Sequence, residues 1–303
     1  PRLRAAGVKA GDMVSGDLEP WGPRYFCTCR QCREAFAKYR KLDTVPEPRE
    51  VLNYLDDWVK FRSIQTETSV AKLAKIVRDY DPGIKVIDYD YIIHYGTDAE
   101  RQFLRGCSKD ASRDDKWLDA HICSYYHTCD KAAFEAIRNN TRKLKADYYP
   151  FGAIAGKGSY LRDGEVRNPA QVRQLALAAA VHGCPGIGFY KGIHYDGEHL
   201  LALMKARDEV AAVEGFPWGR SEGSLAATSG NGQFAWATSA ADGTEVVALF
   251  NYDAKKALTA TVTAPKGGSY TAVDPVTGKS VASSAALGKG LAVTVPAGDV
   301  RFV

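Results

Sequence analysis

The sequence has little net charge and no long hydrophobic run, and each absence excludes a class of protein. Its 40 Lys and Arg residues against 36 Asp and Glu leave a formal net charge of +4, without a dense basic run. That balance argues against a nucleic-acid partner. No apolar stretch is long enough to cross a bilayer, so we expect no membrane partner either. With 303 residues, 45% of them hydrophobic, the chain can hold a large core and more than one domain.

The chain also lacks an initiator methionine and a signal-peptide pattern, since it begins with Pro-Arg-Leu-Arg. We therefore expect it to start within a longer protein. Its 7 cysteines are an odd number, and three of them are clustered. This usage favours a metal site and free thiols over a disulfide framework, and thereby a cytoplasmic location.

Strand-like and helical segments alternate up to about Trp218. The expected strands are Gly11–Glu19, Ile84–Tyr91, Trp117–Tyr126, Ala146–Ile154 and Gly186–Lys191. The expected helices are Gln31–Lys41, Arg49–Tyr80, Lys131–Leu144, Pro169–His182 and Gly197–Val213. Repeated βα units predict an α/β fold with a parallel sheet. We interpret them as the C-terminal five units of a (β/α)8 barrel, with a complete doubly wound domain as the alternative.

The composition changes after Trp218, where helical periodicity stops and short alternating runs appear between turns such as Asp242-Gly243. This pattern predicts an antiparallel β-sandwich. We place the boundary at Phe216-Pro217-Trp218-Gly219. The predicted domains are a barrel catalytic domain over residues 1–217, lacking its first strands, and a sandwich over residues 218–303.

The most informative segment runs from Gly11 to Phe36. A short apolar strand ends at a carboxylate, Glu19, and Trp21 and a C-x-C-x2-C cluster of cysteines 27, 29 and 32 follow. Barrel enzymes carry catalytic carboxylates where strands end. Three thiols at this spacing are typical of a zinc site.

This segment resembles the family 42 β-galactosidases, which are clan-A (β/α)8-barrel glycoside hydrolases. In that family a strand-four acid/base Glu precedes a zinc-binding C-x-C-x2-C cluster. The resemblance implies that Glu19 is the acid/base and that Cys27, Cys29 and Cys32 hold a structural zinc. The segment from Asn168 to Tyr190 and the closing sandwich also resemble the family. Two features depart from it: Leu18 stands where Asn is usual, and residues 149–156 contain no carboxylate for a strand-seven nucleophile.

Glycoside hydrolysis needs a second carboxylate beside Glu19. Asp90 is the first candidate, because it is nearest its strand end, and Asp119 is the second. Asp88 shares the expected face of Asp90. The alternative for each is a salt bridge or a bond to loop backbone. If the strand-seven carboxylate is absent, an inverting mechanism becomes the more plausible one.

Polar and aromatic residues near the expected strand ends suit a sugar-binding pocket. We expect substrate contacts from Trp21, Asp88, Tyr91, His121, Tyr125, Tyr126, Tyr149, Tyr190 and Lys191. The alternative for each residue is simple packing.

The cysteine cluster lacks a fourth ligand for tetrahedral zinc. Cys107, Cys123, Cys129 or a residue outside the chain are candidates, and three reduced thiols are the alternative. We expect no cofactor for catalysis.

The sequence therefore predicts a glycosidase with a carbohydrate substrate. A non-catalytic carbohydrate-binding or assembly subunit on a degenerate barrel is the alternative, and another lyase or hydrolase on the same barrel is a third. Partners would be a second copy of the chain or an N-terminal half of the same protein.

Overall fold

The computed structural model describes residues 2–17, 27–90, 110–125, 130–153, 167–190, 196–264, 271–282 and 290–303. The chain divides into two compact units. The first holds Pro1–Ser124 and Lys143–Tyr148, and the second holds Tyr125–Arg142 and Tyr149–Val303.

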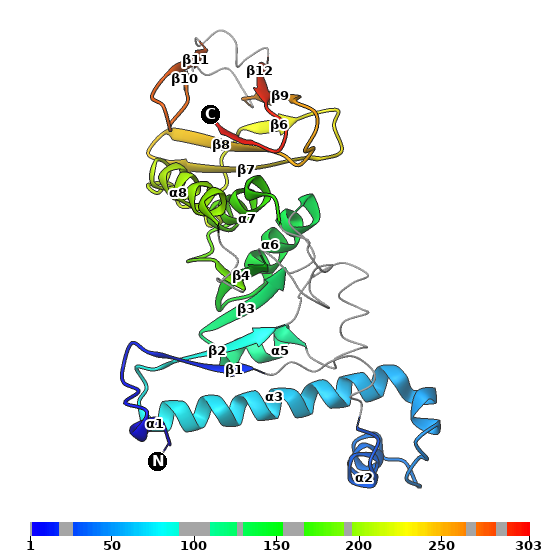
Figure 1. Cartoon of the computed structure of the whole chain (residues 1–303). Coiled ribbons are helices and arrows are strands. Elements are labelled where there is room, and N and C mark those ends of the chain that lie inside the picture. Colours follow the sequence, from blue (N-terminus) through cyan, green and yellow to red (C-terminus); the bar gives the residue numbers. More distant parts are fainter. Residues whose placement is uncertain are drawn as a thin grey trace. The chain divides into compact units, whose positions relative to one another are not determined.

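A five-stranded sheet runs in the order β1-β2-β3-β4-β5. Neighbours β1 and β2, β2 and β3, and β4 and β5 pair in parallel. The strands are Met13–Asp17, Lys85–Asp90, Ala120–Tyr125, Asp147–Ala153 and Gly188–Tyr190. Parallel strands in sequence order, joined through helices, form part of a (β/α)8 barrel, as predicted (Figure 1).

The first unit is built on a long helix, α3 (Leu55–Tyr80). Its apolar side chains pack on one face of β1 and β2 in a cluster that holds Val70, Ala74, Val77, Ile84, Val86 and Leu118, with Val14 against it. The sequence predicted one helix from Arg49, whereas the structure has a 3-10 turn, η2 (Glu50–Tyr54), before α3.

A second small core joins α2 (Arg30–Arg40) to α3. Phe36, Val51, Trp58 and Phe61 are buried together, and the rings of Phe36 and Trp58 have centroids 4.9 Å apart. Three short elements complete this unit, namely α1 (Arg2–Ala5), α5 (Ala111–Asp114) and η3 (Asp115–Trp117).

The second unit contains α6 (Lys131–Lys143), α7 (Pro169–Val181) and α8 (Gly197–Ala211). The predicted caps of α7 are confirmed. Asn168 and Gln171 form a capping box, Pro169 takes the first helical position, and Gly183 leaves the helix at φ +75°. In the described ranges, no helix is long and apolar enough to cross a membrane.

The C-terminal strands form the predicted sandwich from two antiparallel sheets, in the orders β12-β9-β6 and β13-β8-β7. The strands are β6 (Ala226–Thr228), β7 (Phe234–Ala241), β8 (Thr244–Asn251), β9 (Leu258–Thr263), β12 (Leu291–Val295) and β13 (Val300–Phe302), with a small hairpin of β10 (Ala272–Val273) and β11 (Ser280–Ala282). Asp242 and Gly243 both have positive φ, which matches the tight turn predicted between β7 and β8.

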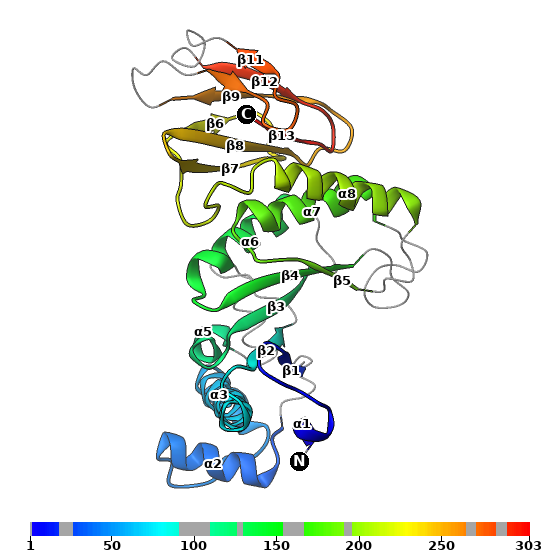
Figure 2. The same ribbon diagram turned by 90° about the vertical axis from the view of Figure 1, so that its left-hand side faces the viewer.

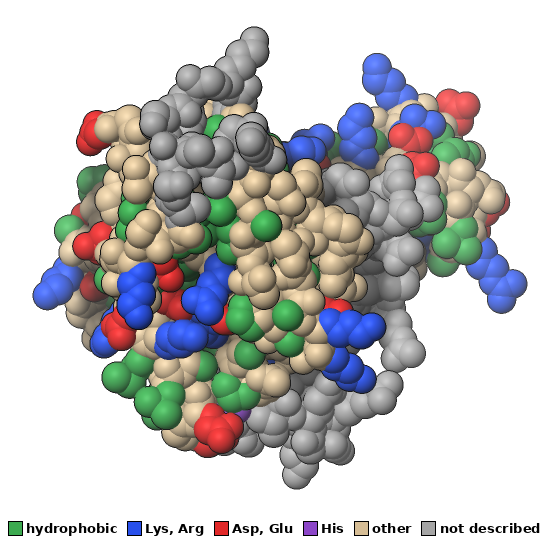
Figure 3. Space-filling model, turned by 90° about the horizontal axis from the view of Figure 1, so that it is seen from above, with side chains coloured by type: hydrophobic (Ala, Val, Ile, Leu, Met, Phe, Trp, Pro, Cys, Tyr) green, Lys and Arg blue, Asp and Glu red, His purple; other side chains and the backbone are tan. Residues whose placement is uncertain are grey.

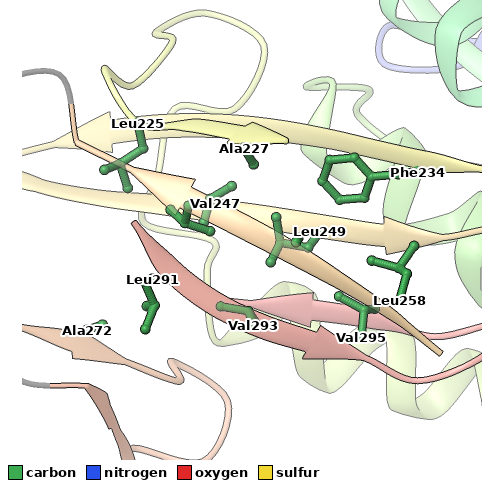
Figure 4. Close-up of a cluster of buried hydrophobic side chains, with 12 residues drawn as sticks. Leu225, Ala227, Phe234, Val247, Leu249, Leu258, Ala272, Leu291, Val293 and Val295 are labelled. Atoms are coloured by element: carbon green, nitrogen blue, oxygen red, sulfur yellow. The ribbon is translucent and has the colours of Figure 1, made fainter. Parts of the chain in front are cut away.

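Alternate residues of these strands point into one core (Figure 4). Val247 and Leu249 of β8 face Leu258 of β9 and Val293 and Val295 of β12. On the molecular face drawn in Figure 3, Lys and Arg side chains are interspersed with Asp and Glu, in keeping with the small net charge.

The sandwich packs on the helices of its own unit (Figure 2). The Gln174 amide of α7 donates to the Asn251 carbonyl at 2.7 Å, and the Phe134 ring of α6 lies 4.9 Å from that of Phe250. The predicted domain boundary at residues 217 and 218 lies between α8 and β6. The compact units divide elsewhere, because these contacts join α6 and α7 to the sandwich.

Candidate active site and metal centre

Catalytic residues of a barrel enzyme lie at the carboxyl ends of the strands and in the segments that follow them. Several predicted site residues fall outside the described ranges, namely Glu19, Trp21, Tyr91, Tyr126 and Lys191. The backbone of Asp90 ends β2, but the described part of the structure does not include its side chain. The roles of these residues remain predictions.

Asp88 and His121 do not lie on an open face of the sheet. They are register partners on β2 and β3, and their exposed fractions are 1% and 0%. Asp88 shares its face with Val86, which packs against α3. His121 places Nε2 3.4 Å from Asp115 Oδ1, and that carboxylate also accepts the backbone N–H groups of Lys145 and Ala146. The burial of both side chains on the face that carries Val86 favours a packing role over the predicted substrate contacts.

Asp119 lies at the wrong end of its strand for catalysis. It precedes β3, so it stands at the amino edge of the sheet. Its carboxylate accepts the Val86 backbone N–H at 2.8 Å and pairs with Arg78 at 3.3 Å. These contacts hold the start of β3 against β2 and α3, and they correct the prediction of a catalytic role.

Tyr125 is also a packing residue rather than a substrate contact. Its side chain is 1% exposed, and its hydroxyl accepts a hydrogen bond from the Asn140 amide of α6 at 3.1 Å. The ring therefore faces the helical layer. The alternation along β3 explains the error, because Tyr125 shares its face with His121.

Tyr149 and Tyr190 lie on the face of β4 and β5 that turns away from α7. The helix side is marked by Gly152, where an added Cβ would lie 2.8 Å from Leu175 of α7. Tyr149 and Phe151 alternate with Gly152 and so face the other way, as does Tyr190, the register neighbour of Ala153. These three rings are half-buried and share this side of the sheet, which we call the aromatic face, with Tyr149 near the amino end of β4 and Tyr190 at the carboxyl end of β5.

Sequence reasoning missed Phe151 as part of this aromatic face. An added Cβ at Gly188 would lie 2.2 Å from the Phe151 ring, so the glycine allows the ring to lie over β5. The sequence pattern that could have indicated Phe151 is the alternation of Tyr149 and Phe151 along β4, together with Gly188 on the neighbouring strand β5.

The three cysteines of the C-x-C-x2-C segment lie close together in the structure. The Sγ atoms of Cys27, Cys29 and Cys32 all lie within 4.8 Å of one another. Cys29 is the N-cap of α2, and Cys32 packs against the Phe36 core while its Sγ accepts from Arg62 Nη1 at 3.5 Å. Hydrogen bonds from the Cys32 backbone and from the neighbouring thiols lower the pKa of Cys29 to about 7.

Three thiols in this arrangement fit three corners of a tetrahedral zinc site. Within the described part of the chain, no His, Cys, Asp or Glu joins them as a fourth ligand. Cys123, one of the candidates, is buried in β3 and is not in the cluster. Cys107 and Cys129 fall outside the described residues.

Comparison with known families identifies the sandwich. Residues 230–303 match the alpha galactosidase C-terminal beta sandwich domain, a segment that holds β7 to β13. The match does not reach the segment that resembles family 42. No curated protein matches the chain in sequence. A barrel sheet followed by this sandwich supports a glycoside hydrolase in general.

Solved structures resemble the chain only weakly. A candidate α-galactosidase from Bacteroides fragilis is 12% identical with a TM-score of 0.35, covering 77% of this chain and 64% of its own. A maltogenic amylase from S. marinus is 10% identical with a TM-score of 0.41, covering 84% and 38%. The α-fucosidase from Thermotoga maritima is 13% identical with a TM-score of 0.39, covering 99% and 65%. The chain thus spans less than two thirds of the length of each of these proteins.

Proposed function

We propose that the protein is a glycoside hydrolase in which Glu19 is the general acid/base. The observation that carries the proposal is the α-galactosidase-type sandwich that follows a parallel barrel sheet. Glu19 comes two residues after β1, where a barrel strand delivers its side chains to the site. The adjoining Pro20 and Trp21 would restrict water and raise the pKa of this carboxyl group, as a general acid requires.

Asp90 is our proposed second carboxylate. It ends β2 at the carboxyl edge of the sheet, next to β1, whereas Asp119 stands at the opposite edge. Alternation gives Asp90 the same face as the buried Asp88, so the proposal requires its carboxylate to reach around the end of the strand toward the site. Acting as a base on water, Asp90 would give inversion, with carboxylates about 6.5–9.5 Å apart; acting as a nucleophile, it would give retention at about 5–5.5 Å. Because β4 carries no carboxylate after Asp147, we favour inversion.

The proposed substrate is an oligosaccharide or polysaccharide, with an α-galactoside as the first to test because of the sandwich match. On the aromatic face, Phe151 and Tyr190 lie toward the carboxyl ends of β4 and β5 and would stack on a sugar ring. Cys27, Cys29 and Cys32 would hold a structural zinc at the start of α2, fastening that helix rather than taking part in the reaction.

The test is hydrolysis of a panel of α- and β-linked aryl glycosides and oligosaccharides by the whole chain and by Glu19→Gln. We expect the substitution to reduce turnover by about 10²- to 10⁴-fold without changing the fold. Glu34→Gln on the exposed face of α2 is the matched control and should retain full activity. Product stereochemistry, followed by NMR, distinguishes inversion from retention.

A non-catalytic sugar-binding subunit is the second candidate. It is favoured by the burial of Asp88, the position of Asp119 and the lack of a carboxylate in residues 149–156. This function predicts no turnover of any glycoside by the wild type, together with sugar binding that survives Glu19→Gln. That result would replace the hydrolase proposal.

A further inference from the structure

A polar cavity of about 250 Å³ lies within the second unit, bordered by α6, the end of α7 and strand β7. These elements lie side by side in both views (Figures 1 and 2). The cavity contains none of the residues assigned to the proposed active site. Its polar lining comes from Arg138, Thr141, Arg142, His182, Glu222 and Thr238.

Two buried nitrogen atoms at this cavity lack a hydrogen-bond partner in the described part of the chain. His182 is 5% exposed, and its Nε2 atom has no hydrogen-bond partner among the described residues. The same is true of Nε of Arg138. Leaving a buried polar atom unsatisfied costs about 1–3 kcal/mol, so such atoms commonly indicate a bound group.

Like charges are placed together on the same wall. Arg138 and Arg142 are four residues apart on α6, so both guanidinium groups project from one face of the helix. Burial and the nearby charge of Arg138 lower the pKa of Arg142. Burial, followed by the charges of Arg138 and Arg142, lowers the pKa of His182 to about 3, so this imidazole is neutral and can donate from Nε2.

A carboxylate already occupies the rim of the cavity. Glu222 forms an ion pair with Arg142, and the two side chains are 67% and 53% exposed. Exposed pairs of this kind are weak, so an incoming anion can displace Glu222. With two arginines against one glutamate, the lining retains one excess positive charge beside Nε2 of His182.

The backbone around His182 is closely packed. An added Cβ at Gly219 would lie 2.3 Å from the His182 carbonyl oxygen, and one at Gly183 would lie 2.4 Å from that of Trp218. Both glycines have positive φ, so only they allow the segment before the sandwich to approach the end of α7. The His182 ring is further held by Phe134, with centroids 4.4 Å apart.

We propose that this cavity binds a compact oxyanion: a sulfate, a phosphate or the carboxylate of an acidic sugar. Arg138 Nε and His182 Nε2 would donate hydrogen bonds to the oxygens of the ligand from the buried side of the cavity. At the rim, the Arg142 guanidinium would release Glu222 and pair with the ligand. The Thr141 hydroxyl and the Trp236 side chain would border the rest of the group, and the volume admits a monosaccharide acid.

The test is isothermal titration of the whole chain with sodium sulfate, sodium phosphate, galacturonate and neutral galactose at constant ionic strength. We expect at least one oxyanion to bind and galactose not to bind. Arg138→Gln and Arg142→Gln should each weaken binding at least about tenfold, because a charge-assisted contact is lost. Glu222→Gln should tighten it, because the competing carboxylate is removed. Arg220→Gln, an exposed position outside the cavity, is the control and should change nothing.

The outcomes separate the sources of the ligand. Tighter binding of galacturonate than of sulfate and phosphate identifies an acidic sugar, and the reverse order identifies an inorganic or esterified oxyanion. Absence of binding by all three, equal binding of galactose and galacturonate, or affinities that are unchanged in the cavity variants would overturn the proposal. Arg142 and Glu222 are exposed, so their variants test it even if Arg138→Gln fails to fold.

Discussion

Arg173 of α7 and Asp299, next to β13, form an ion pair at 2.5 Å, although they are 126 residues apart in the sequence. The same guanidinium donates through Nε and Nη2 to both carboxylate oxygens of Glu209 on α8. Arg173 and Glu209 are 4% and 6% exposed. Burial by itself lowers the pKa of Arg173, but the opposite charges of Glu209 and Asp299 outweigh this effect and raise the pKa overall, so the arginine stays charged. One side chain thus joins two helices to the sandwich.

Replacing this arginine should destabilise the second unit. Arg173→Met leaves two carboxylates without their cation, and breaking a buried pair in this way costs about 3–5 kcal/mol. Urea unfolding of the whole chain measures the loss. Arg207→Met, at an exposed position on α8, is the control and should change the free energy of unfolding by less than about 0.5 kcal/mol. Equal stability of the two variants would show that the network contributes little.

The aromatic face depends on glycine at position 188. Gly188→Ala places a Cβ 2.2 Å from the Phe151 ring, so the ring or the strand must move, at a cost of about 1–3 kcal/mol. Gly197→Ala is the matched control, because it meets open space in the first turn of α8. Thermal unfolding should show a lower midpoint for Gly188→Ala than for Gly197→Ala and the wild type. A Gly188→Ala protein as stable as wild type would contradict the packing described for Phe151.

The buried His182 predicts a loss of stability at low pH. Its pKa is lowered from 6.5 to about 3, so between these two pH values His182 is protonated in the unfolded chain and neutral in the folded chain. Stability is therefore retained above pH 6.5 and lost as the pH falls toward 3. Between pH 7 and 5 this group should account for about 2 kcal/mol of lost unfolding free energy. His182→Gln should show a correspondingly flatter pH dependence, and parallel curves would refute the assignment.

The cysteine cluster predicts one bound zinc per chain. Cys29→Ser removes one of three adjacent thiols that would bind the metal, so zinc measured by mass spectrometry should fall well below one equivalent. Cys184→Ala, outside the cluster, should keep the metal. Chelation should also weaken the packing of α2 on α3, which fluorescence of the buried Trp58 would report. Full zinc content in Cys29→Ser would place the metal elsewhere.

The order and type of the main elements can be predicted from the amino-acid sequence alone. The Asn168-Pro169 start and the Gly183 end of α7 follow from capping chemistry, and the Asp242-Gly243 turn follows from two residues that accept positive φ. These signals are local, so no tertiary context was needed to read them. The clustering of the three cysteines was equally readable, because it depends on a spacing within one short segment.

Which face of each strand the helices cover depends on packing between distant segments and cannot be predicted from local sequence. Asp88 and His121 are neighbours because β2 and β3 pair in register. The sequence does not show which helices cover them; the packing of Val86 against α3 and the contact of Asp115 with His121 do. The same limit applies to Arg138, His182 and Glu222, which come from separate segments and meet at one cavity. Local chemistry fixes where an element begins and ends, whereas packing between distant elements determines which side chains stay open to a ligand.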